Sequence, residues 1–304
     1  MKKEISFFLF HCEIEKKLSP KTLKAYETDL RQFATFLKTD DLTKITKDDL
    51  KLYLGILSKF ASRTMKRKVA TLKTFFSFLE FEEAIETNPF HKVRIKIKLE
   101  KLLPKILSIA EINAILKNVY AEKASVNTKN SYQYKEAIRN VAILELLLAT
   151  GIRVSELCGL KKENIGANFE TIRILGKGNK ERNVPITNTA TQEALQNNYL
   201  SFKTMIDTSS YFFINRFGNP ISTQSVRFLV KKYAMKANIQ RTITPHVFRH
   251  SFATLLLEED VDIRYIQHFL GHSSINVTQM YAHVNEKKKT ELLTVKNPRN
   301  FVHF

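Results

Sequence analysis

Residues 244–281 hold side chains that could act together on a phosphodiester. His246, Arg249, His272 and Tyr281 lie in this stretch, and His246 and Arg249 are one helical turn apart, so a helix would place them on one face. Arginine keeps its positive charge, histidine exchanges a proton near neutral pH, and a phenol can act as a nucleophile. These groups could bind a phosphate, move its protons and attack it.

Two upstream motifs add further charged side chains. Arg153 follows Thr-Gly-Ile at a predicted helix start, with Glu156 three residues later, and Lys177 lies between two glycines at the tip of a predicted hairpin. Transfer at a phosphodiester needs donors on the non-bridging oxygens and an acid for the leaving oxygen. The alternatives are an ordinary surface pair of Arg153 with Glu156 and a solvated Lys177. The motif G-K-G-N-K lacks the Walker A spacing, so nucleotide hydrolysis is not supported.

The spacing of the histidines also suggests a metal site. His246 with His250, and His268 with His272, are spaced four residues apart, as metal ligands on a helix often are. Neither pair has the glutamate of an H-E-x-x-H motif, and no Asp, Glu or Cys cluster completes a site. We therefore expect no metal and no other cofactor, and we interpret His250 and His268 as structural.

The composition favours a polyanionic partner. The chain has 304 residues, 43% of them hydrophobic, with a net charge of +19 and a pI near 9.8. Both the first 100 residues and the remainder are net basic, so the charge is not confined to one tail. Nucleic acid is the first candidate, and a basic protein without such a partner is the alternative. The length allows two domains.

The sequence contains no segment that we expect to enter a membrane. The apolar N-terminus is interrupted by Glu4, His11 and Glu13, unlike the core of a signal peptide, and the apolar run 142–150 contains Glu145 and is too short to span a bilayer. The two cysteines, Cys12 and Cys158, show no metal-ligand spacing and favour a reducing compartment. We expect a cytoplasmic protein.

The first 90 residues are predicted to form an all-helical bundle. Ser19-Pro20 suits a helix start, Thr46 with Asp49 resembles a capping box, and 62–80 carries a helical apolar stripe. No strand-like alternation occurs in this part. Basic residues lie off the apolar stripe of the 62–80 helix and are predicted to bind DNA: Arg63, Lys66, Arg67 and Lys73.

The remaining chain is predicted to be mostly helical with a small sheet. Residues 91–105 form a basic linker, with an edge strand as the alternative, and 127–134 form a loop. Strand-like runs at 171–175 and 182–186 flank the Gly-rich turn and predict a β-hairpin. Helices are predicted at 108–118, 137–149, 153–160, 189–206, 222–237, 246–258 and 262–270.

Four ordered motifs resemble those of the tyrosine recombinase (phage integrase) family, most closely its Xer-type members. They are T-G-I-R-V-S-E-L-C-G-L, G-K-G-N-K-E-R-N-V-P, P-H-V-F-R-H-S-F-A-T and L-G-H-S-S-I-N-V-T-Q-M-Y. The stretch S-P-K-T-L-K-A-Y-E-T-D-L matches the N-terminal domain of that group, so the resemblance covers nearly the whole chain. It implies a helical, SAM-like core-binding domain at 1–90, the linker at 91–105, and a mixed α/β catalytic domain at 106–304, together a C-shaped clamp around DNA.

The resemblance also implies a role for each motif residue. Tyr281 would attack the scissile phosphate, giving a 3′-phosphotyrosyl link and a free 5′-hydroxyl. Arg153 and Arg249 would hold the non-bridging oxygens, and Lys177 would protonate the departing 5′-oxygen.

Three further residues have supporting roles in this scheme. His246 and His272 would position the phosphate and assist proton transfer, and Glu156 would orient its neighbours. The covalent link retains the energy of the broken diester, so strand exchange would need no ATP.

The function implied is site-specific recombination of double-stranded DNA through a Holliday junction. The enzyme would act as a homo- or hetero-tetramer on two sites, with an accessory activator protein as a further partner, to resolve chromosome or plasmid dimers. The alternatives are an integrase or excisionase of a mobile element, an inactive DNA-binding relative, and a metal-dependent nuclease. The 23 residues after Tyr281 would form an exchange tail on a neighbouring subunit, or else a frayed terminus.

Overall fold

The chain forms two compact units. The computed structural model describes residues 1–37, 41–98, 106–128, 131–176, 181–271, 290 and 293–302. Contacts divide the chain into residues 1–102 and 103–304, a division that falls inside the stretch predicted as a linker. Residues 93–98, the described part of this stretch after a short 3₁₀ turn, take up neither helix nor strand. Each unit is described by itself.

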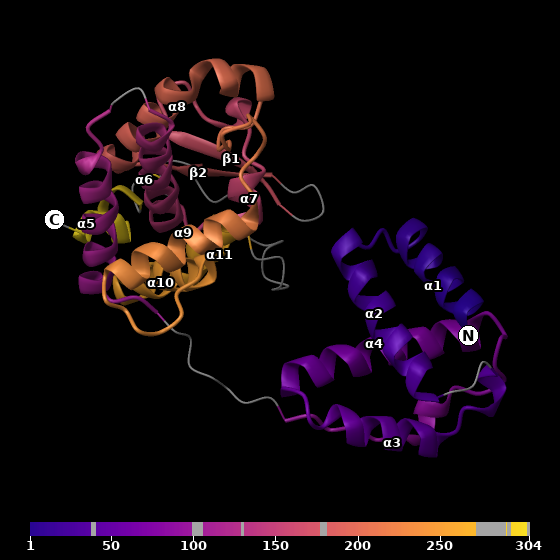
Figure 1. The fold of residues 1–304 in the computed structure, drawn as a ribbon. Helices are drawn as coiled ribbons and strands as arrows, with labels where there is room; N and C mark the ends of the chain where they lie inside the picture. Colours follow the sequence, from indigo (N-terminus) through magenta and orange to yellow (C-terminus); the bar gives the residue numbers. More distant parts are fainter. Residues whose placement is uncertain are drawn as a thin grey trace. The chain divides into compact units, whose positions relative to one another are not determined.

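The N-terminal unit is a bundle of helices, as the sequence predicts. Its helices are α1 (Lys2–Ile14), α2 (Pro20–Leu37), α3 (Lys47–Leu57) and α4 (Ser62–Phe81), with 3₁₀ turns η1 (Leu42–Lys44) and η2 (Pro89–Lys92). The capping box of Thr46 and Asp49 is present at the start of α3. Helix α4 lies between the α1–α2 pair and α3 (Figure 1). Its stripe buries Phe75 and Phe76 completely, against Phe8 and Phe33.

A buried carboxylate joins α2 to α4. Asp29 is 1% exposed and accepts hydrogen bonds from Lys68 Nζ at 2.8 Å and Thr71 Oγ1 at 3.2 Å, and it also pairs with Arg67. A buried charge is tolerated only when it is paired and hydrogen-bonded. These cations of α4 therefore fix the position of the helix that carries the predicted DNA-binding residues.

The C-terminal unit is built around one buried helix. Every residue from 137 to 150 of α6 (Tyr132–Thr150) is buried, against α5 (Ile109–Ser125), α8 (Thr189–Ser209) and α10 (Pro245–Glu258). Helix α6 begins inside the predicted 127–134 loop, because Ser131 Oγ accepts the Tyr134 N–H at 3.2 Å and caps the helix. The remaining elements are α7 (Val154–Cys158), η3 (Lys162–Asn164), α9 (Thr223–Lys236), α11 (Ile263–Leu270) and η5 (Pro298–Phe301).

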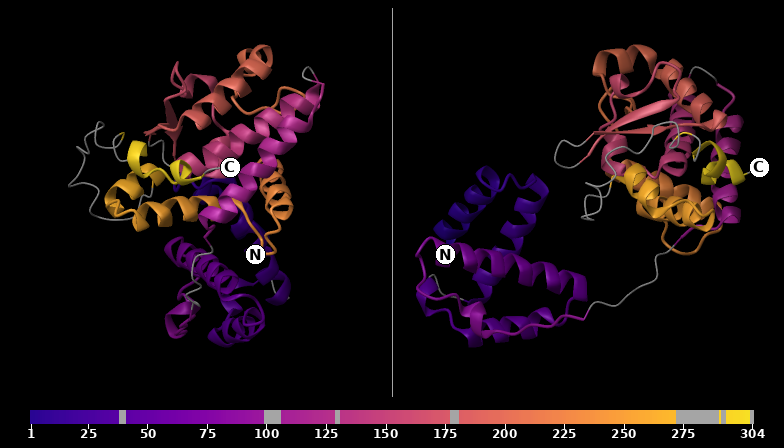
Figure 2. Two further views of the ribbon diagram at one scale, coloured as in Figure 1. Left: turned by 90° about the vertical axis from the view of Figure 1, so that its left-hand side faces the viewer. Right: turned by 180° about the vertical axis from the view of Figure 1, so that it is seen from behind.

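A two-stranded antiparallel sheet lies beside α11. Strands β1 (Thr171–Leu175) and β2 (Glu181–Pro185) pair with Ile172 opposite Val184 and Ile174 opposite Arg182. Alternate residues of both strands are buried, so the hairpin presents one face to the core. Figure 2 shows the hairpin between α8 and the α10–α11 pair. The small sheet is as predicted, with the second strand one residue earlier.

The described part of the C-terminal tail packs within the C-terminal unit. Leu293 and Asn297 are fully buried, and Asn297 Nδ2 donates to the carbonyl of Ala149 at 2.9 Å. Arg299 donates through Nε and Nη2 to the Glu145 carboxylate of α6, the latter at 2.7 Å. The tail is thus anchored within the chain rather than frayed over residues 293–302. Its exchange onto a neighbouring subunit stays a prediction.

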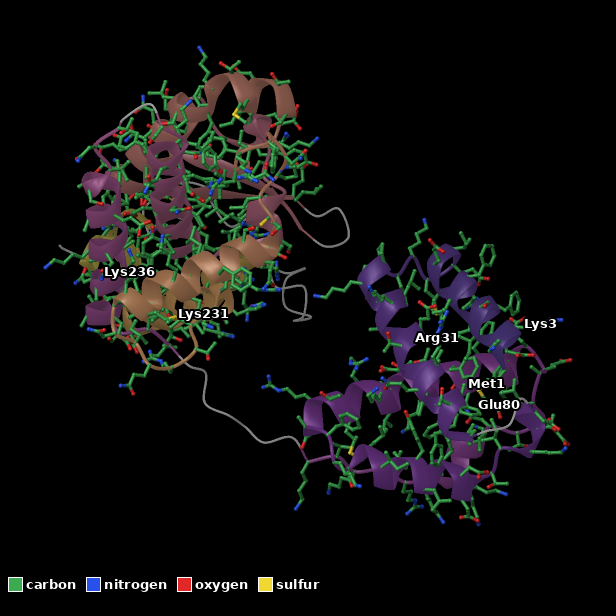
Figure 3. The ribbon with its side chains drawn as sticks, in the orientation of Figure 1. Met1, Lys3, Arg31, Glu80, Lys231 and Lys236 are labelled. Atoms are coloured by element: carbon green, nitrogen blue, oxygen red, sulfur yellow. The ribbon has the colours of Figure 1, made fainter. Side chains whose placement is uncertain are left out.

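Charged side chains cover the outer surfaces of both units. On α9, Figure 3 labels Lys231 and Lys236, and Lys236 Nζ pairs with Glu122 of α5 at 2.6 Å.

Among the residues that the structure describes, no helix combines the length and apolar character that crossing a membrane requires.

The Glu145–Arg299 pair should contribute strongly to stability. We expect Arg299→Ala to lower the free energy of unfolding of the C-terminal unit by about 3–5 kcal/mol, because it leaves the carboxylate of Glu145 buried without its cation. Urea unfolding followed by circular dichroism measures this loss.

Arg31→Ala is the matched control. Arg31 (labelled in Figure 3) forms an exposed pair with Glu27 on α2, and such pairs contribute about 0–1 kcal/mol. Equal losses from the two substitutions would show that the buried pair has no special weight.

Candidate active site

Arg153 is placed by the sharp end of α6. Gly151 ends the helix with φ of +58°, and a Cβ there would lie 2.7 Å from Cδ1 of Phe252, so only glycine fits. Arg153 then becomes the N-cap of α7, where its backbone N–H and its Nη1 donate to the two carboxylate oxygens of Glu156 at 3.0 and 2.8 Å. The Glu156 side chain is only 7% exposed and that of Arg153 33%, so this is not an ordinary surface pair.

The Glu156 carboxylate also binds a residue that the sequence analysis did not single out. Arg182 of β2 donates through Nη1 and Nη2 to its two oxygens, at 3.1 and 2.8 Å. Burial would raise the pKa of Glu156, but the hydrogen bonds and charge of Arg182, with the bonds from Arg153, hold it below its usual value. The carboxylate is therefore ionised at neutral pH. The sequence signal that could have identified Arg182 is its position, a charged residue on the face of a predicted strand that should be buried.

Arg249 lies almost completely buried in the first half of α10. It is 6% exposed and donates through Nη1 to the carbonyl of Gly151 at 2.7 Å and through Nη2 to that of Leu270 at 2.6 Å. Burial, followed by the charge of Arg153, lowers the pKa of Arg249 to about 10, so it stays cationic at neutral pH. This side chain joins the ends of α6 and α11.

The carboxyl end of α11 is the meeting point of these arginines. The last carbonyls of a helix lack partners within it and carry partial negative charge. Three consecutive carbonyl oxygens accept from three guanidinium groups: Phe269 from Arg182 at 2.8 Å, Leu270 from Arg249 at 2.6 Å and Gly271 from Arg153 at 3.1 Å. Elements far apart in the sequence converge on one turn.

His246 is exposed in the first turn of α10, on the same helix as Arg249. Partial burial, followed by the charges of His250 and Arg249, lowers the pKa of His246 below its usual value. Arg227 of α9 and Arg153 act in the same direction, so both lie within electrostatic reach of the imidazole. Arg227 is a second cation near the site that the sequence analysis did not identify.

Three predicted catalytic residues lie outside the described residues: Lys177, His272 and Tyr281. In the sequence, Lys177 lies between β1 and β2, and His272 and Tyr281 follow Gly271. Within the described ranges, no three His, Cys, Asp or Glu side chains come together as a metal site would require.

The predicted DNA-binding residues all lie on α4. Arg63, Lys66, Arg67 and Lys73 are all exposed, and Arg67 also pairs with the buried Asp29. DNA binding by these side chains stays a prediction.

The described part of the site carries more positive than negative charge. Arg153, Arg182 and Arg249 surround the single carboxylate of Glu156 within the residues that the structure describes, with the His246 imidazole nearby. Arginine donors are suited to anionic oxygens because their charged forks form strong paired hydrogen bonds. The arrangement fits a phosphate oxygen approaching the accessible side of Arg153 and His246.

Comparison with known proteins gives consistent matches over the whole chain. A model described as the phage integrase family matches residues 107–288, and one described as the phage integrase N-terminal SAM-like domain matches residues 5–83. A tyrosine recombinase of Agathobacter rectalis is 42% identical over 301 residues, covering 99% of this chain and 98% of the relative. Tyrosine recombinase XerC of Pediococcus pentosaceus is 36% identical, covering 97% and 98%.

Solved structures show the same fold. XerH recombinase bound to its difH substrate, in a pre-cleavage complex, aligns with a TM-score of 0.69 at 20% identity, over 95% of this chain and 83% of that one. A lambda integrase (75–356) dimer bound to a COC′ core site aligns with a TM-score of 0.67 at 18% identity, over 90% and 95%.

The electrostatics of the site can be tested on His246. In the free protein, we expect its imidazole to titrate below the usual histidine pKa, and His250→Gln to raise that pKa part of the way back, because one neighbouring positive charge is removed. Histidine ring signals followed by NMR from about pH 5 to 8 measure this, with His246→Gln for assignment. A pKa at or above the usual value would contradict the placement of these cations.

Proposed function

This chain belongs to the phage integrase family of tyrosine recombinases, and we propose that Tyr281 is its nucleophile and Arg153 and Arg249 its phosphate-binding residues. The chain is accordingly an enzyme of site-specific recombination, which breaks and rejoins DNA. The proposal concerns which residues perform the steps, on which DNA, and in what assembly.

The convergence of Arg153 and Arg249 on the end of α11 supports this assignment most directly. The two side chains start 96 positions apart in the sequence and donate to adjacent carbonyls, of Gly271 and Leu270, just before His272. Each guanidinium has five N–H donors. Donors therefore remain for the non-bridging oxygens of a phosphate, next to the chain that leads to Tyr281.

The proposed reaction conserves the number of phosphate ester bonds. The Tyr281 hydroxyl oxygen bonds to phosphorus while the bond to the 5′-oxygen breaks, and Lys177 gives that oxygen its proton. The phenol proton passes to an imidazole, for which His246 is suited because its lowered pKa keeps it neutral near pH 7. Reversal by another 5′-hydroxyl rejoins the strand, so no nucleotide cofactor is consumed.

The N-terminal unit is proposed to bind the duplex through α4. Arg63, Lys66 and Lys73 project from this helix into solvent, and cations in such positions bind phosphates by releasing counterions. Arg67 can contribute only with the side of its guanidinium that Asp29 leaves open.

We assign the chain to resolution of chromosome or plasmid dimers, as a homo- or hetero-tetramer on two DNA sites. Relatives over nearly the whole chain bear the names tyrosine recombinase XerC and XerD, which favours this role over integration of a mobile element. An accessory activator protein is part of the same proposal. Deleting the gene decides between the two roles: unseparated chromosomes support resolution, whereas normal division with loss of element excision supports integration.

A nicked suicide substrate should trap the covalent intermediate. We expect wild type to form a protein–DNA adduct in EDTA and Tyr281→Phe to form none, because the phenol oxygen is the attacking atom. Gel electrophoresis under denaturing conditions measures the adduct.

The outcomes separate the alternatives. Intact DNA binding without adduct from wild type would indicate an inactive DNA-binding relative, and cleavage only with added metal would indicate a nuclease. Arg153→Gln should reduce adduct formation by about 10²–10³-fold while the protein stays folded, as expected when one donor to a reacting oxyanion is removed.

The α4 lysines should set part of the salt dependence of DNA binding. For Lys66→Ala with Lys73→Ala, we expect the slope of log K against log salt to fall by about 1 for each lysine removed. Fluorescence anisotropy with a labelled duplex measures the slope. Lys51→Ala on α3, whose lysine pairs with Asp48 at 3.2 Å, is the control and should leave the slope unchanged. An unchanged slope in the α4 variant would place the DNA elsewhere.

A further inference from the structure

Arg182 occupies a position that the strand pattern reserves for an apolar side chain. It shares the buried face of β2 with Val184, lies opposite Ile174 of β1, and its side chain is only 6% exposed. A charged group in such a place is stable only when its donors are satisfied. Three of its donors are used, by the carboxylate oxygens of Glu156 and the carbonyl of Phe269.

The partners of Arg182 all belong to the active site. The Glu156 carboxylate accepts hydrogen bonds from the backbone N–H and the side chain of Arg153. The Phe269 carbonyl is the first of the three at the end of α11 that accept hydrogen bonds from arginines. Arg182 also lies against Gly271, where a Cβ would come within 2.9 Å of its Nη1 and 3.2 Å of its Cδ. Gly271, with φ of +63°, is the last described residue before His272.

We propose that Arg182 is a positioning residue for strand cleavage, which holds Glu156 and the end of α11 in one arrangement and so sets the places of Arg153 and of the chain entering His272. Its own strand begins at Glu181, four positions after Lys177 in the sequence. This inference rests on the proposed function of the site. Arg182 itself is assigned no contact with DNA.

A purely structural role for Arg182 would have a different effect from a positioning role. An arginine that only fills the core would affect stability alone, and each folded molecule would cleave normally. A positioning residue affects the rate of cleavage at saturating DNA, because small displacements of reacting groups lower rates steeply. The two roles are therefore separable by single-turnover kinetics.

The ionisation of Glu156 gives a second, independent readout. The charged groups that face it are Arg153 on α7, Arg182 on β2 and Arg249 on α10. Without Arg182, burial is less well compensated, and the pKa of Glu156 moves up. Protonated Glu156 can no longer accept all the bonds that hold Arg153.

The experiment measures adduct formation by the full-length chain on suicide substrate, at saturating enzyme and from about pH 5 to 8. For Arg182→Gln, we expect about a 10²-fold lower rate than wild type, DNA affinity within about twofold, and an additional loss of rate at acidic pH. Adding Glu156→Gln should abolish the additional acidic loss, whereas any loss from His246 persists in every variant.

Arg182→Lys is the conservative variant. It allows the proposal to be tested even if Arg182→Gln does not fold. A lysine keeps the charge beside Glu156 but cannot form the paired hydrogen bonds of the guanidinium. It should restore the wild-type pH profile with an intermediate rate. A wild-type rate in Arg182→Lys and no change in Arg182→Gln would overturn the proposal.

Arg139→Gln is the matched control for a buried arginine. Arg139 of α6 is 4% exposed and donates to the carbonyl of Ile214 at 2.8 Å, away from Glu156. We expect it to lose stability yet cleave at the wild-type rate per folded molecule. Equal slowing by Arg139→Gln and Arg182→Gln would assign Arg182 a structural role only.

Failure of the proposed function would be recognised separately. No Tyr281-dependent adduct from wild type would contradict that function, whereas adduct from wild type with unaltered Arg182 variants would contradict only this inference. Carboxyl NMR titration of Glu156, assigned with Glu156→Gln, tests the Arg182 contact without any reaction. A pKa unchanged by Arg182→Gln would overturn it.

Discussion

Mutual repulsion among three arginines is the constraint around which the candidate active site of the C-terminal unit is arranged. Arg153, Arg182 and Arg249 lie close enough for each of the other two to lower the pKa of Arg249. Such a cluster is stable only because anionic or dipolar groups face each cation. The Glu156 carboxylate and the last carbonyls of α11 provide these partners. A phosphate would add a further anion to a site that is already positive.

The buried C-terminal end of helix α6 provides several of the contacts that hold this arrangement together. Gly151 terminates the helix, offers its carbonyl to Arg249 and turns the chain to Arg153. Earlier in the same helix, the Ala149 carbonyl accepts from Asn297 of the tail, and Glu145 binds Arg299. The tail and the active site therefore rest on the same helix.

The N-terminal unit also contains a buried carboxylate that is paired with cations. Asp29 is buried beneath α4 and is neutralised by Lys68 and Arg67 of that helix. The buried Lys68 and the more exposed Arg67 fix the helix through this carboxylate, and the exposed Arg63, Lys66 and Lys73 remain available for a polyanion. Charge is thus divided by helical periodicity: one side of α4 stabilises the bundle, and another offers a basic surface.

Local sequence signals determined the helices, the capping box at Thr46, the hairpin and the identity of Arg153, His246 and Arg249 as candidates. Each of these depends on residues a few positions apart, where spacing and side-chain type carry the information. Arg182, the carbonyl row at α11 and the pairing of Arg299 with Glu145 were decided only by the tertiary structure. Their partners lie between 21 and 154 residues away, and no local pattern shows which buried charge meets which.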